Sequence, residues 1–369
     1  MKILLLGDYS NVHWTLSEGL RTLGHEVTVV SDGDGWKNYR RDIDLTRRSL
    51  GRIDTILYIY RLRRVISRLR GYDIIQVINP IFLDLMAERI EPYYEQLRRQ
   101  NPGARFVLGA FGVDHYWVSE GLKPDTFRYS DFYFYGQQRD YPYLREMKRD
   151  WVDGYKGTLN LRMAREADAI VAGLYEYDVC YRPHYPAKTF FIPLPINRST
   201  LAPSARWHEG EKIRFFIGIQ KARNAYKGTD IMLRALQRLE RQYPDLMEVV
   251  KAESVPYYQY VDMLDSSHVL LDQLYSYTPA MNGLLGMAKG MVLVGGGEEE
   301  QYAILPEPTL RPIINVQPDE DDVVRQIEER LLLSPSSVSQ LQADSATYIA
   351  RHHDHVKVAR QYEALYQSL

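Results

Sequence analysis

The chain is poor in cysteine, in net charge and in long apolar runs. Cys180 is its one cysteine, so no disulfide can form within the chain and no cysteine cluster can bind a metal. The 46 basic and 48 acidic side chains nearly cancel, so the chain as a whole lacks the strongly basic charge balance typical of a nucleic-acid-binding protein. No stretch approaches the about 20 apolar residues of a membrane span, and the apolar run at the N-terminus is too short for a signal peptide. These absences favour a cytoplasmic protein.

Short apolar runs alternate with amphipathic stretches along most of the chain. The first apolar run, near Leu4, is followed by Leu16, Leu20 and Leu23 at helical spacing, then by Gly24 and a second run. This order predicts a β-α-β unit. Further runs that predict strands lie at 72–78, 104–112, 167–173, 188–195, 212–219, 246–253, 268–274, 291–294 and 312–316. Continuously apolar strands separated by amphipathic helices predict parallel sheets covered on both faces.

The pattern restarts after a connection that contains prolines at 193, 195 and 203. The chain is therefore predicted to form two doubly wound, Rossmann-like α/β domains, 1–195 and 196–350, and a helical tail, 351–369.

Two stretches do not follow the alternation of strand and helix. Residues 45–71 combine apolar residues with many arginines, which run from Arg47 to Arg70. They fit either a sheet-covering helix with a solvated basic face or a peripheral contact with an anionic membrane. Residues 115–157 are long, aromatic and irregular, and they follow a predicted strand, so they either shape a binding cleft or form a structural insertion.

Five stretches, in order, resemble the GT-B glycosyltransferases, and most closely the retaining type called group 1 or family 4. They are NVHWTLSEGLRTLGHEVTVV (11–30), FFIPLPIN (190–197), GIQKARNAYKGTDIMLRAL (218–236), GLLGMAKGMVLVGGG (283–297) and ATYIARHHDHVKVARQYEALY (346–366). The resemblance covers nearly the whole chain. It implies two domains that face each other across a cleft, with a C-terminal helix that packs back on the first domain. It also implies sugar transfer, with retention, from a nucleotide-sugar to a saccharide or lipid-linked acceptor in polysaccharide or glycoconjugate assembly.

The donor diphosphate needs cations and helix N-termini at the carboxyl ends of strands. Lys221, Arg223 and Lys227 lie in one predicted strand-to-helix loop, where Gly228 lets the backbone come close. We expect Arg223 and Lys227 to bind the diphosphate and to stabilise charge on the departing nucleotide; the alternative is a solvated basic loop.

Other candidates lie in the first predicted domain. Gly7, Ser10 and Asn11 follow the first strand. Gly7 permits close approach of the backbone, and Ser10 and Asn11 could form hydrogen bonds with a phosphate group or with the acceptor. The resemblance puts His13 near the acceptor and Asp114 near the donor sugar, where a carboxylate could hold a hydroxyl. A structural histidine and a turn or capping aspartate are the alternatives.

The family's two glutamates, eight positions apart, are missing. Alignment of the MAKG stretch puts Tyr277 and Leu285 in their places. Asp272, followed by Gln273, resembles a family variant in which this dipeptide follows the strand, and Asn282 could supply uncharged hydrogen bonds. Further donor-binding candidates are Gly283, Gly295, Gly296, Gly297 and Glu298, with Glu300 in the same acidic loop.

The missing glutamates leave more than one function open. A retaining transfer can proceed without a protein base if the leaving phosphate oxygen takes the acceptor's proton. The alternatives are a catalytically silent protein that binds nucleotide-sugars or scaffolds another transferase, and a sugar-nucleotide epimerase or phosphorylase-like enzyme. We expect no cofactor and no metal, because consecutive histidines in the HHDH stretch (352–355) cannot converge on one ion.

Overall fold

The structure is a computed structural model that describes residues 1–220 and 224–369, apart from the side chain of Tyr257. The chain forms two compact units. Unit 1 contains Met1–Glu120, Glu146–Pro195 and His355–Leu369, and unit 2 contains Gly121–Arg145 and Ile196–Asp354. The sequence-based division ran without interruption from 1 to 195, whereas Gly121–Arg145 group with the second unit.

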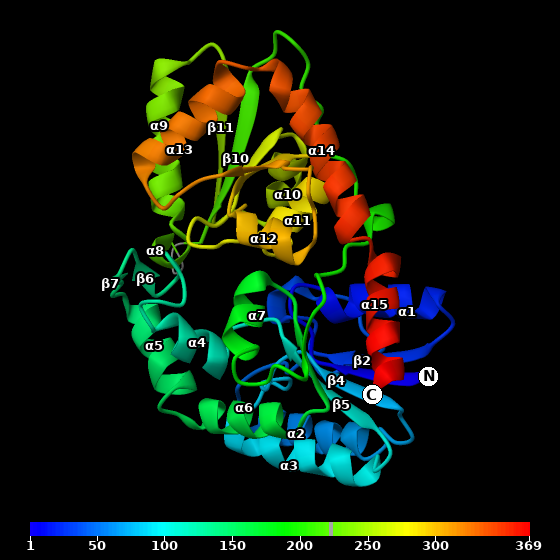
Figure 1. Ribbon diagram of the computed structural model, residues 1–369. Helices are drawn as coiled ribbons and strands as arrows, with labels where there is room; N and C mark the ends of the chain where they lie inside the picture. The colour runs from blue at the N-terminus through cyan, green and yellow to red at the C-terminus, as the bar shows by residue number, and fades with distance from the viewer. Residues whose placement is uncertain (221–223) are drawn as a thin grey trace. The chain divides into compact units, whose positions relative to one another are not determined.

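Unit 1 is built on a seven-stranded parallel sheet in the order β3-β2-β1-β4-β5-β8-β9. Its strands are β1 (Lys2–Leu6), β2 (Glu26–Ser31), β3 (Ile43–Asp44), β4 (Ile74–Val77), β5 (Arg105–Ala110), β8 (Ala169–Ala172) and β9 (Thr189–Phe191). Its helices are α1 (Val12–Thr22), α2 (Arg52–Ile66), α3 (Ala87–Gln100), α4 (His115–Gly121), α6 (Tyr155–Glu166), α7 (Tyr175–Tyr181) and α15 (His355–Ser368), with a short η1 (Gly35–Lys37). Helices α1 and α15 cover one face of the sheet, and α2, α3 and α6 cover the other (Figure 1).

Unit 2 is built on a five-stranded parallel sheet in the order β11-β10-β12-β13-β14. Its strands are β10 (Ile213–Ile219), β11 (Met247–Glu253), β12 (Val269–Leu271), β13 (Val292–Gly295) and β14 (Ile313–Asn315), beside a small hairpin of β6 (Tyr133–Phe134) and β7 (Gln137–Gln138). Its helices are α8 (Asn224–Lys227), α9 (Thr229–Gln242), α10 (Tyr257–Asp265), α11 (Met281–Ala288), α12 (Glu299–Ile304), α13 (Glu320–Ile327) and α14 (Ser336–His352), with short helices η2 (Arg198–Thr200) and η4 (Glu328–Leu332). Helix α5 (Pro142–Trp151) contributes residues to both units. Helices α9 and α13 pack together on one side of the sheet, and α11 packs with α14 on the other (Figure 1).

Each unit has its own apolar core. In unit 1, Leu16 and Leu20 of α1 and Tyr362 of α15 are fully buried against sheet residues such as Leu5 and Val29. The core of unit 2 is made by other residues, among them Phe215, Leu236 and Val294. The predicted α/β class and the two doubly wound sheets are confirmed, and the C-terminal helix packs on the first helix of unit 1.

Both sheets contain a point where the strand order reverses. After β3 the chain returns to the other side of β1 and forms β4, and after β11 it returns to the other side of β10 and forms β12. In open α/β sheets, ligands bind at the carboxyl ends of the strands on either side of such a point. The residues that follow β1, β10 and β12 are therefore the natural place to look for a site. Among the described residues no helix is both long and apolar enough to cross a membrane.

Candidate functional site

The loop between β10 and α9 holds the predicted cations. Lys221 and Arg223 lie outside the described residues, whereas Lys227 ends α8 and is partly exposed. Gly228 follows with φ 70°, and a Cβ atom there would lie 2.8 Å from the Cβ of Leu274. The backbone N–H of Leu274 donates to the carbonyl oxygen of Lys227 at 2.9 Å, so the loops after β10 and β12 are joined. A glycine is needed at 228 because the turn is left-handed and this approach leaves no room for a side chain.

Asp272, just after β12, is the centre of a small polar cluster. Its side chain is buried; Oδ1 accepts a hydrogen bond from Asn282 Nδ2 at 3.1 Å, and Oδ2 accepts one from the backbone N–H of Gly283 at 3.2 Å. Lys227 Nζ lies 4.0 Å from Oδ1. Asn282 Oδ1 in turn accepts a hydrogen bond from the Tyr260 hydroxyl at 3.2 Å. Four residues predicted separately, Lys227, Asp272, Asn282 and Gly283, thus form one cluster.

The cluster puts a carboxylate at the N-terminus of α11. The unpaired N–H groups of a first helical turn attract anions. Here Asp272 already accepts from one of these groups, and Lys227 is the cation beside it. A diphosphate at this end of α11 would meet a favourable helix terminus and lysine, but also a negative carboxylate.

Close packing explains the run of three glycines that begins at Gly295, the last residue of β13. A Cβ atom at Gly296 would lie 2.0 Å from the carbonyl oxygen of Ser276, and one at Gly297 would lie 2.8 Å from Ile313. The N–H of Gly297 also donates to Asn315 Oδ1 at 3.0 Å. These glycines therefore allow the end of β13 and the loop after it to pack closely against the loop after β12 and against strand β14.

Glu298 follows these glycines, and both of its carboxylate oxygens accept hydrogen bonds from neighbouring residues. Its Oε1 accepts from the Tyr129 hydroxyl at 2.6 Å and from Gln317 Nε2 at 2.7 Å, and its Oε2 accepts from Arg128 Nη2 at 2.9 Å. Burial by itself would raise the pKa of Glu298, but hydrogen bonds from Asn315, Tyr129 and Gln317 outweigh it and lower that pKa below its usual range. Glu298 is thus held as an anion among donors of the protein itself.

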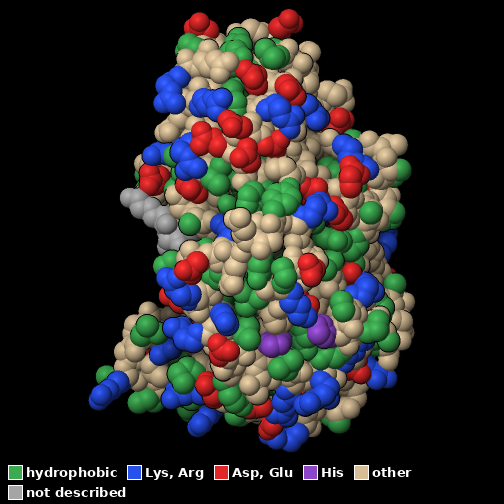
Figure 2. Space-filling view, turned by 60° about the vertical axis from the view of Figure 1, so that its left-hand side comes forward, with side chains coloured by type: hydrophobic (Ala, Val, Ile, Leu, Met, Phe, Trp, Pro, Cys, Tyr) green, Lys and Arg blue, Asp and Glu red, His purple; other side chains and the backbone are tan. Residues whose placement is uncertain are grey.

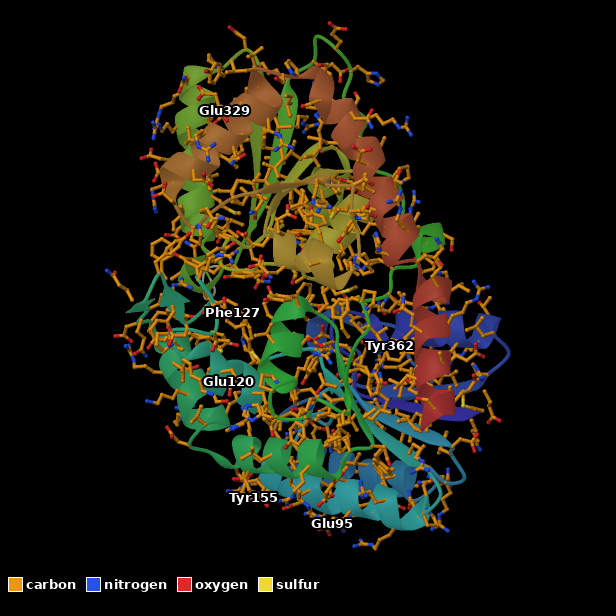
Figure 3. The ribbon with its side chains drawn as sticks, in the orientation of Figure 1. Glu95, Glu120, Phe127, Tyr155, Glu329 and Tyr362 are labelled. Carbon is orange, nitrogen blue, oxygen red and sulfur yellow. The ribbon has the colours of Figure 1, made fainter. Side chains whose placement is uncertain are left out.

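Two of these partners come from Gly121–Arg145, which we call the strap. Arg128 also forms an ion pair with Glu300, and Tyr135 donates its hydroxyl hydrogen to Gln317 Oε1 at 2.9 Å. Arg139 donates to the carbonyl oxygen of Ala225 at 2.5 Å, and its guanidinium lies 3.3 Å from the centre of the Tyr275 ring. The strap therefore contacts the residues that follow β10, β12, β13 and β14, along the carboxyl edge of the sheet in unit 2. Phe127, which is labelled in Figure 3, also belongs to the strap.

Tyr277, which replaces the first family glutamate, anchors the strap. Its hydroxyl oxygen accepts from the backbone N–H of Arg128 at 2.7 Å, and the Arg128 guanidinium lies 4.7 Å from its ring centre. The rings of Phe127 and Tyr129 pack around it at 5.7 and 4.9 Å. Burial raises the pKa of Tyr277 to about 12, so its hydroxyl stays protonated. Leu285, at the place of the second glutamate, is half-buried in α11.

The candidate site residues of unit 1 make contacts with other residues of that unit. His13 is buried; its Nδ1 donates to the carbonyl oxygen of Gly7 at 2.7 Å, and its Nε2 pairs with Gln76 Nε2 at 3.1 Å. Because burial lowers the pKa of His13 to about 3, the ring is neutral and Nε2 accepts from the Gln76 amide. Gln76 Oε1 accepts from the Tyr366 hydroxyl at 2.8 Å, which ties this chain of bonds to α15.

Asp114 is buried at the start of α4. It accepts from the N–H of Trp117 at 2.8 Å and from the Tyr181 hydroxyl at 2.7 Å, and burial raises its pKa to about 7. It therefore stands as a helix cap in the structure.

The loop after β1 is shaped by its backbone and by one acid that the sequence did not single out. Gly7 has φ 73°, and a Cβ atom there would lie 2.5 Å from a methyl of Ile78. Ser10 donates its N–H to Asp34 at 2.9 Å, and Asn11 Nδ2 donates to Thr15 Oγ1 at 3.3 Å. The unexpected acid is Asp8, whose two oxygens accept from the N–H groups of His13 and Trp14, each at 3.1 Å. The sequence signal that could have identified Asp8 is its position shortly before the start of a helix.

Solved structures with this arrangement cover the whole chain. Sucrose-phosphate synthase from Thermosynechococcus elongatus aligns with 100% of this chain and 99% of its own, with a TM-score of 0.62 and 14% identity. HepE from Anabaena, in complex with UDP-glucose, aligns over 100% of both chains with a TM-score of 0.60 and 12% identity. The chain has the GT-B fold. UDP-GlcNAc 2-epimerase from Neisseria meningitidis, bound to UDP-GlcNAc, also aligns over 100% of both chains, with a TM-score of 0.55 and 9% identity. No protein-family model and no curated protein matches the chain. At these identities the likeness shows the GT-B fold alone, and the fold is shared by a transferase and an epimerase.

Proposed function

We propose that the protein is a glycosyltransferase that transfers a sugar from a UDP-sugar to a saccharide or lipid-linked acceptor, with retention, in polysaccharide or glycoconjugate assembly. The observation that carries the proposal is the cluster of Lys227, Asp272, Asn282 and Gly283 beside the reversal point of the second sheet. A cation, a helix N-terminus and a carboxylate beside one another suit a diphosphate joined to a sugar. The choice of UDP rests on the bound UDP-glucose named for HepE.

In the proposed reaction, Lys227 and the N-terminus of α11 hold the diphosphate, together with Lys221 and Arg223 of the same loop. As the bond between the anomeric carbon and the phosphate oxygen breaks, these groups take up the negative charge on the leaving group. The acceptor oxygen bonds to the anomeric carbon on the same face, and its proton passes to the departing phosphate oxygen. Asp272 holds a sugar hydroxyl, and no metal or other cofactor takes part.

Binding of UDP and of UDP-glucose, measured by calorimetry, tests the donor site. Lys227→Ala should weaken both affinities about tenfold or more, because a charge-assisted contact with the diphosphate is lost. Lys227→Arg should restore most of the affinity. Lys212→Ala is the matched control, since Lys212 is exposed at the amino end of β10, the opposite edge of the sheet. Equal affinities in the wild type and Lys227→Ala would refute the assignment.

Asp272 gives a second test, which separates sugar recognition from charge. Asp272→Asn should weaken UDP-glucose binding much more than UDP binding if the carboxylate holds a sugar hydroxyl. Tighter binding of both ligands would mean that the carboxylate only opposes the diphosphate, which contradicts its proposed role.

The second candidate is a catalytically silent GT-B protein that binds a nucleotide-sugar or scaffolds another transferase. It is favoured by the replacement of both glutamates and by the engagement of Glu298 with the strap. Donor turnover distinguishes the two: release of free glucose or transfer to an oligosaccharide supports the enzyme, and binding without turnover supports the silent protein. An epimerised sugar among the products would point to the third possibility, an epimerase.

A further inference from the structure

Helix α2 in unit 1 turns a row of large apolar side chains toward solvent. Ile53, Ile56, Leu57 and Tyr60 follow one another at helical spacing on one side of the helix, and Leu50 precedes them. The exposed fractions are 80% for Leu50, 76% for Ile53, 67% for Ile56, 59% for Leu57 and 68% for Tyr60. Single exposed apolar residues are ordinary on proteins, but a continuous row marks an interaction surface. We call these five residues the apolar row.

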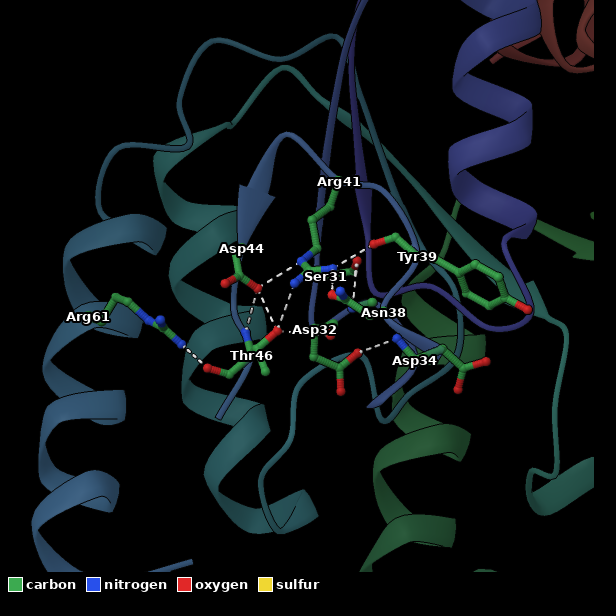
Figure 4. Close-up of polar contacts among 10 residues, drawn as sticks. Ser31, Asp32, Asp34, Asn38, Tyr39, Arg41, Asp44, Thr46 and Arg61 are labelled. Atoms are coloured by element: carbon green, nitrogen blue, oxygen red, sulfur yellow. Dashed lines mark hydrogen bonds and ion pairs between the residues drawn. The ribbon is translucent and has the colours of Figure 1, made fainter. Parts of the chain in front are cut away.

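The opposite side of α2 is fixed to unit 1, so the apolar row does not face the core. Tyr58, Leu62 and Ile66 are buried against the unit. Arg61 donates to the carbonyl oxygen of Thr46, in a network that also joins Arg41 to Thr46 Oγ1 at 3.0 Å (Figure 4). Arg41 further donates to Asp44 Oδ1 at 2.7 Å and to the carbonyl oxygen of Tyr39 at 2.6 Å. The burial of Tyr58, Leu62 and Ile66 and the hydrogen bond of Arg61 determine which side of the helix remains exposed.

Arginines surround the apolar row. Arg52 and Arg63 lie on one flank of the helix, Arg64 continues the line of the row, and Arg48 and Arg68 lie beyond its two ends. All five are exposed. Between residues 45 and 71 the one acid is Asp54, which already accepts a hydrogen bond from Ser49. In the space-filling view, Lys and Arg side chains, with some Asp and Glu, are interspersed with hydrophobic ones on the lower part of the face shown (Figure 2).

We propose that α2 docks unit 1 on the surface of a bilayer that contains anionic lipids. An interfacial helix needs an apolar side that enters the boundary between headgroups and acyl chains and basic residues at the level of the phosphates. The apolar row and its five arginines provide both. Arginine suits this place because its guanidinium binds phosphate in a bidentate way and its stem can lie along apolar surface.

Charge is what favours a lipid surface over a second copy of the chain. In a symmetric dimer formed through α2, the arginines of one copy would lie close to those of the other and repel them. Asp54 alone cannot neutralise this charge. Anionic headgroups neutralise the same arginines, and neutral lipids do not. The inference does not depend on the proposed function, because it concerns only α2 and the residues directly before and after it.

Flotation of the full-length protein with lipid vesicles tests the proposal. The protein should bind vesicles of phosphatidylcholine mixed with phosphatidylglycerol, should bind pure phosphatidylcholine vesicles at least several-fold more weakly, and should be released by high salt. The double variant Ile53→Ser/Leu57→Ser and the double variant Arg52→Gln/Arg63→Gln should each lose most of the binding. Leu333→Ser is the matched control, because Leu333 is an equally exposed apolar residue in unit 2.

Four outcomes would overturn the proposal. They are no binding to anionic vesicles, equal binding to neutral ones, full binding by the Ile53→Ser/Leu57→Ser variant, and a wild-type dimer in size-exclusion chromatography that this variant abolishes. The last would make the apolar row an interface between copies of the chain. Because these side chains are on the surface, circular dichroism should show that both double variants fold normally.

Discussion

At the scale of single residues, His13 links three parts of unit 1. Its ring donates to the loop after β1 and accepts from Gln76 of β4, and Gln76 accepts from Tyr366 of α15. A protonated ring would place a second N–H against the Gln76 amide, which is itself a donor. With this orientation of the Gln76 amide the contacts of His13 fit the neutral ring, which agrees with its lowered pKa.

This pairing predicts how stability depends on pH. The native state lowers the pKa of His13 from 6.5 to about 3, so between these values the unfolded state binds a proton that the native state does not. The stabilisation is complete above about pH 6.5 and is lost as the pH falls, by about 1.4 kcal/mol per pH unit. In urea unfolding, the free-energy difference between the wild type and His13→Gln should therefore shrink on acidification. A difference that stays constant from pH 7 to pH 5 would contradict the neutral, buried ring.

The sequence allowed us to predict that candidate residues lie close together where they are near one another along the chain, whereas their roles in binding or catalysis stay predictions. Asp272, which the resemblance suggested, lies within about one strand-to-helix connection of Asn282 and Gly283, and the fold of this connection brings the three together. The role of Tyr277 was not accessible in this way, because its partner Arg128 is 149 positions away. Nothing in the local sequence of either residue indicates that contact.

At the scale of elements, the strap changes what the candidate site is made of. Residues 115–157 were open to two interpretations, a binding cleft or a structural insertion, and the strap within them contacts the loops at the carboxyl edge of the second sheet. Its arginines and tyrosines meet Glu298, Glu300 and Gln317, which would otherwise be available to a ligand. A donor bound at this edge must therefore lie beside the strap or displace part of it.

Arg128 is the residue through which we expect the strap to be released. Arg128→Ala should destabilise the strap by about 1 to 3 kcal/mol, since it removes hydrogen bonds to two carboxylates and leaves Glu298 with fewer donors. Amide hydrogen exchange of residues 127–139 should become faster, while the sheet of unit 2 stays protected. Arg145→Ala is the control, because the ion pair between Arg145 and Asp140 is exposed. Unchanged exchange in Arg128→Ala would show that the aromatic contacts of Tyr277 hold the strap without it.

Helix α2 illustrates why the exposed face of a helix is hard to predict. Apolar residues occur on both of its sides, with Tyr58, Leu62 and Ile66 on one and Ile53, Leu57 and Tyr60 on the other. Periodicity alone could not tell which set is buried. Neighbours distant in sequence decide it: Arg61 reaches the carbonyl oxygen of Thr46, and Gln100 of α3 donates to that of Ile66 at 2.6 Å.

At the scale of the whole molecule, two doubly wound sheets were predictable from the sequence, whereas the grouping of the strap with unit 2 was not. Most strands carry their own apolar run, although β3, β6 and β7 were not among the predicted strands, and Pro193 and Pro195 lie directly before Ile196, where the longer segment of unit 2 begins. The strap gives no such signal, because it joins unit 2 through side chains distributed along four different loops. The last helix follows the resemblance and returns to unit 1, where Tyr362 is fully buried.

Because the two cores share no residue, we expect the units to respond separately to substitution. Gly19 of α1 provides the test, since a Cβ atom there would lie 2.3 Å from the carbonyl oxygen of His355 and 2.7 Å from the Cβ of Ala359. Gly19→Ala must push α15 away from α1, which costs about 1 to 3 kcal/mol and exceeds the gain in helix propensity. In scanning calorimetry it should lower the transition of unit 1 by several degrees and leave that of unit 2 in place. Gly103→Ala, where the space is open, should change neither. A parallel fall of the whole profile in Gly19→Ala would mean that the two units unfold as one.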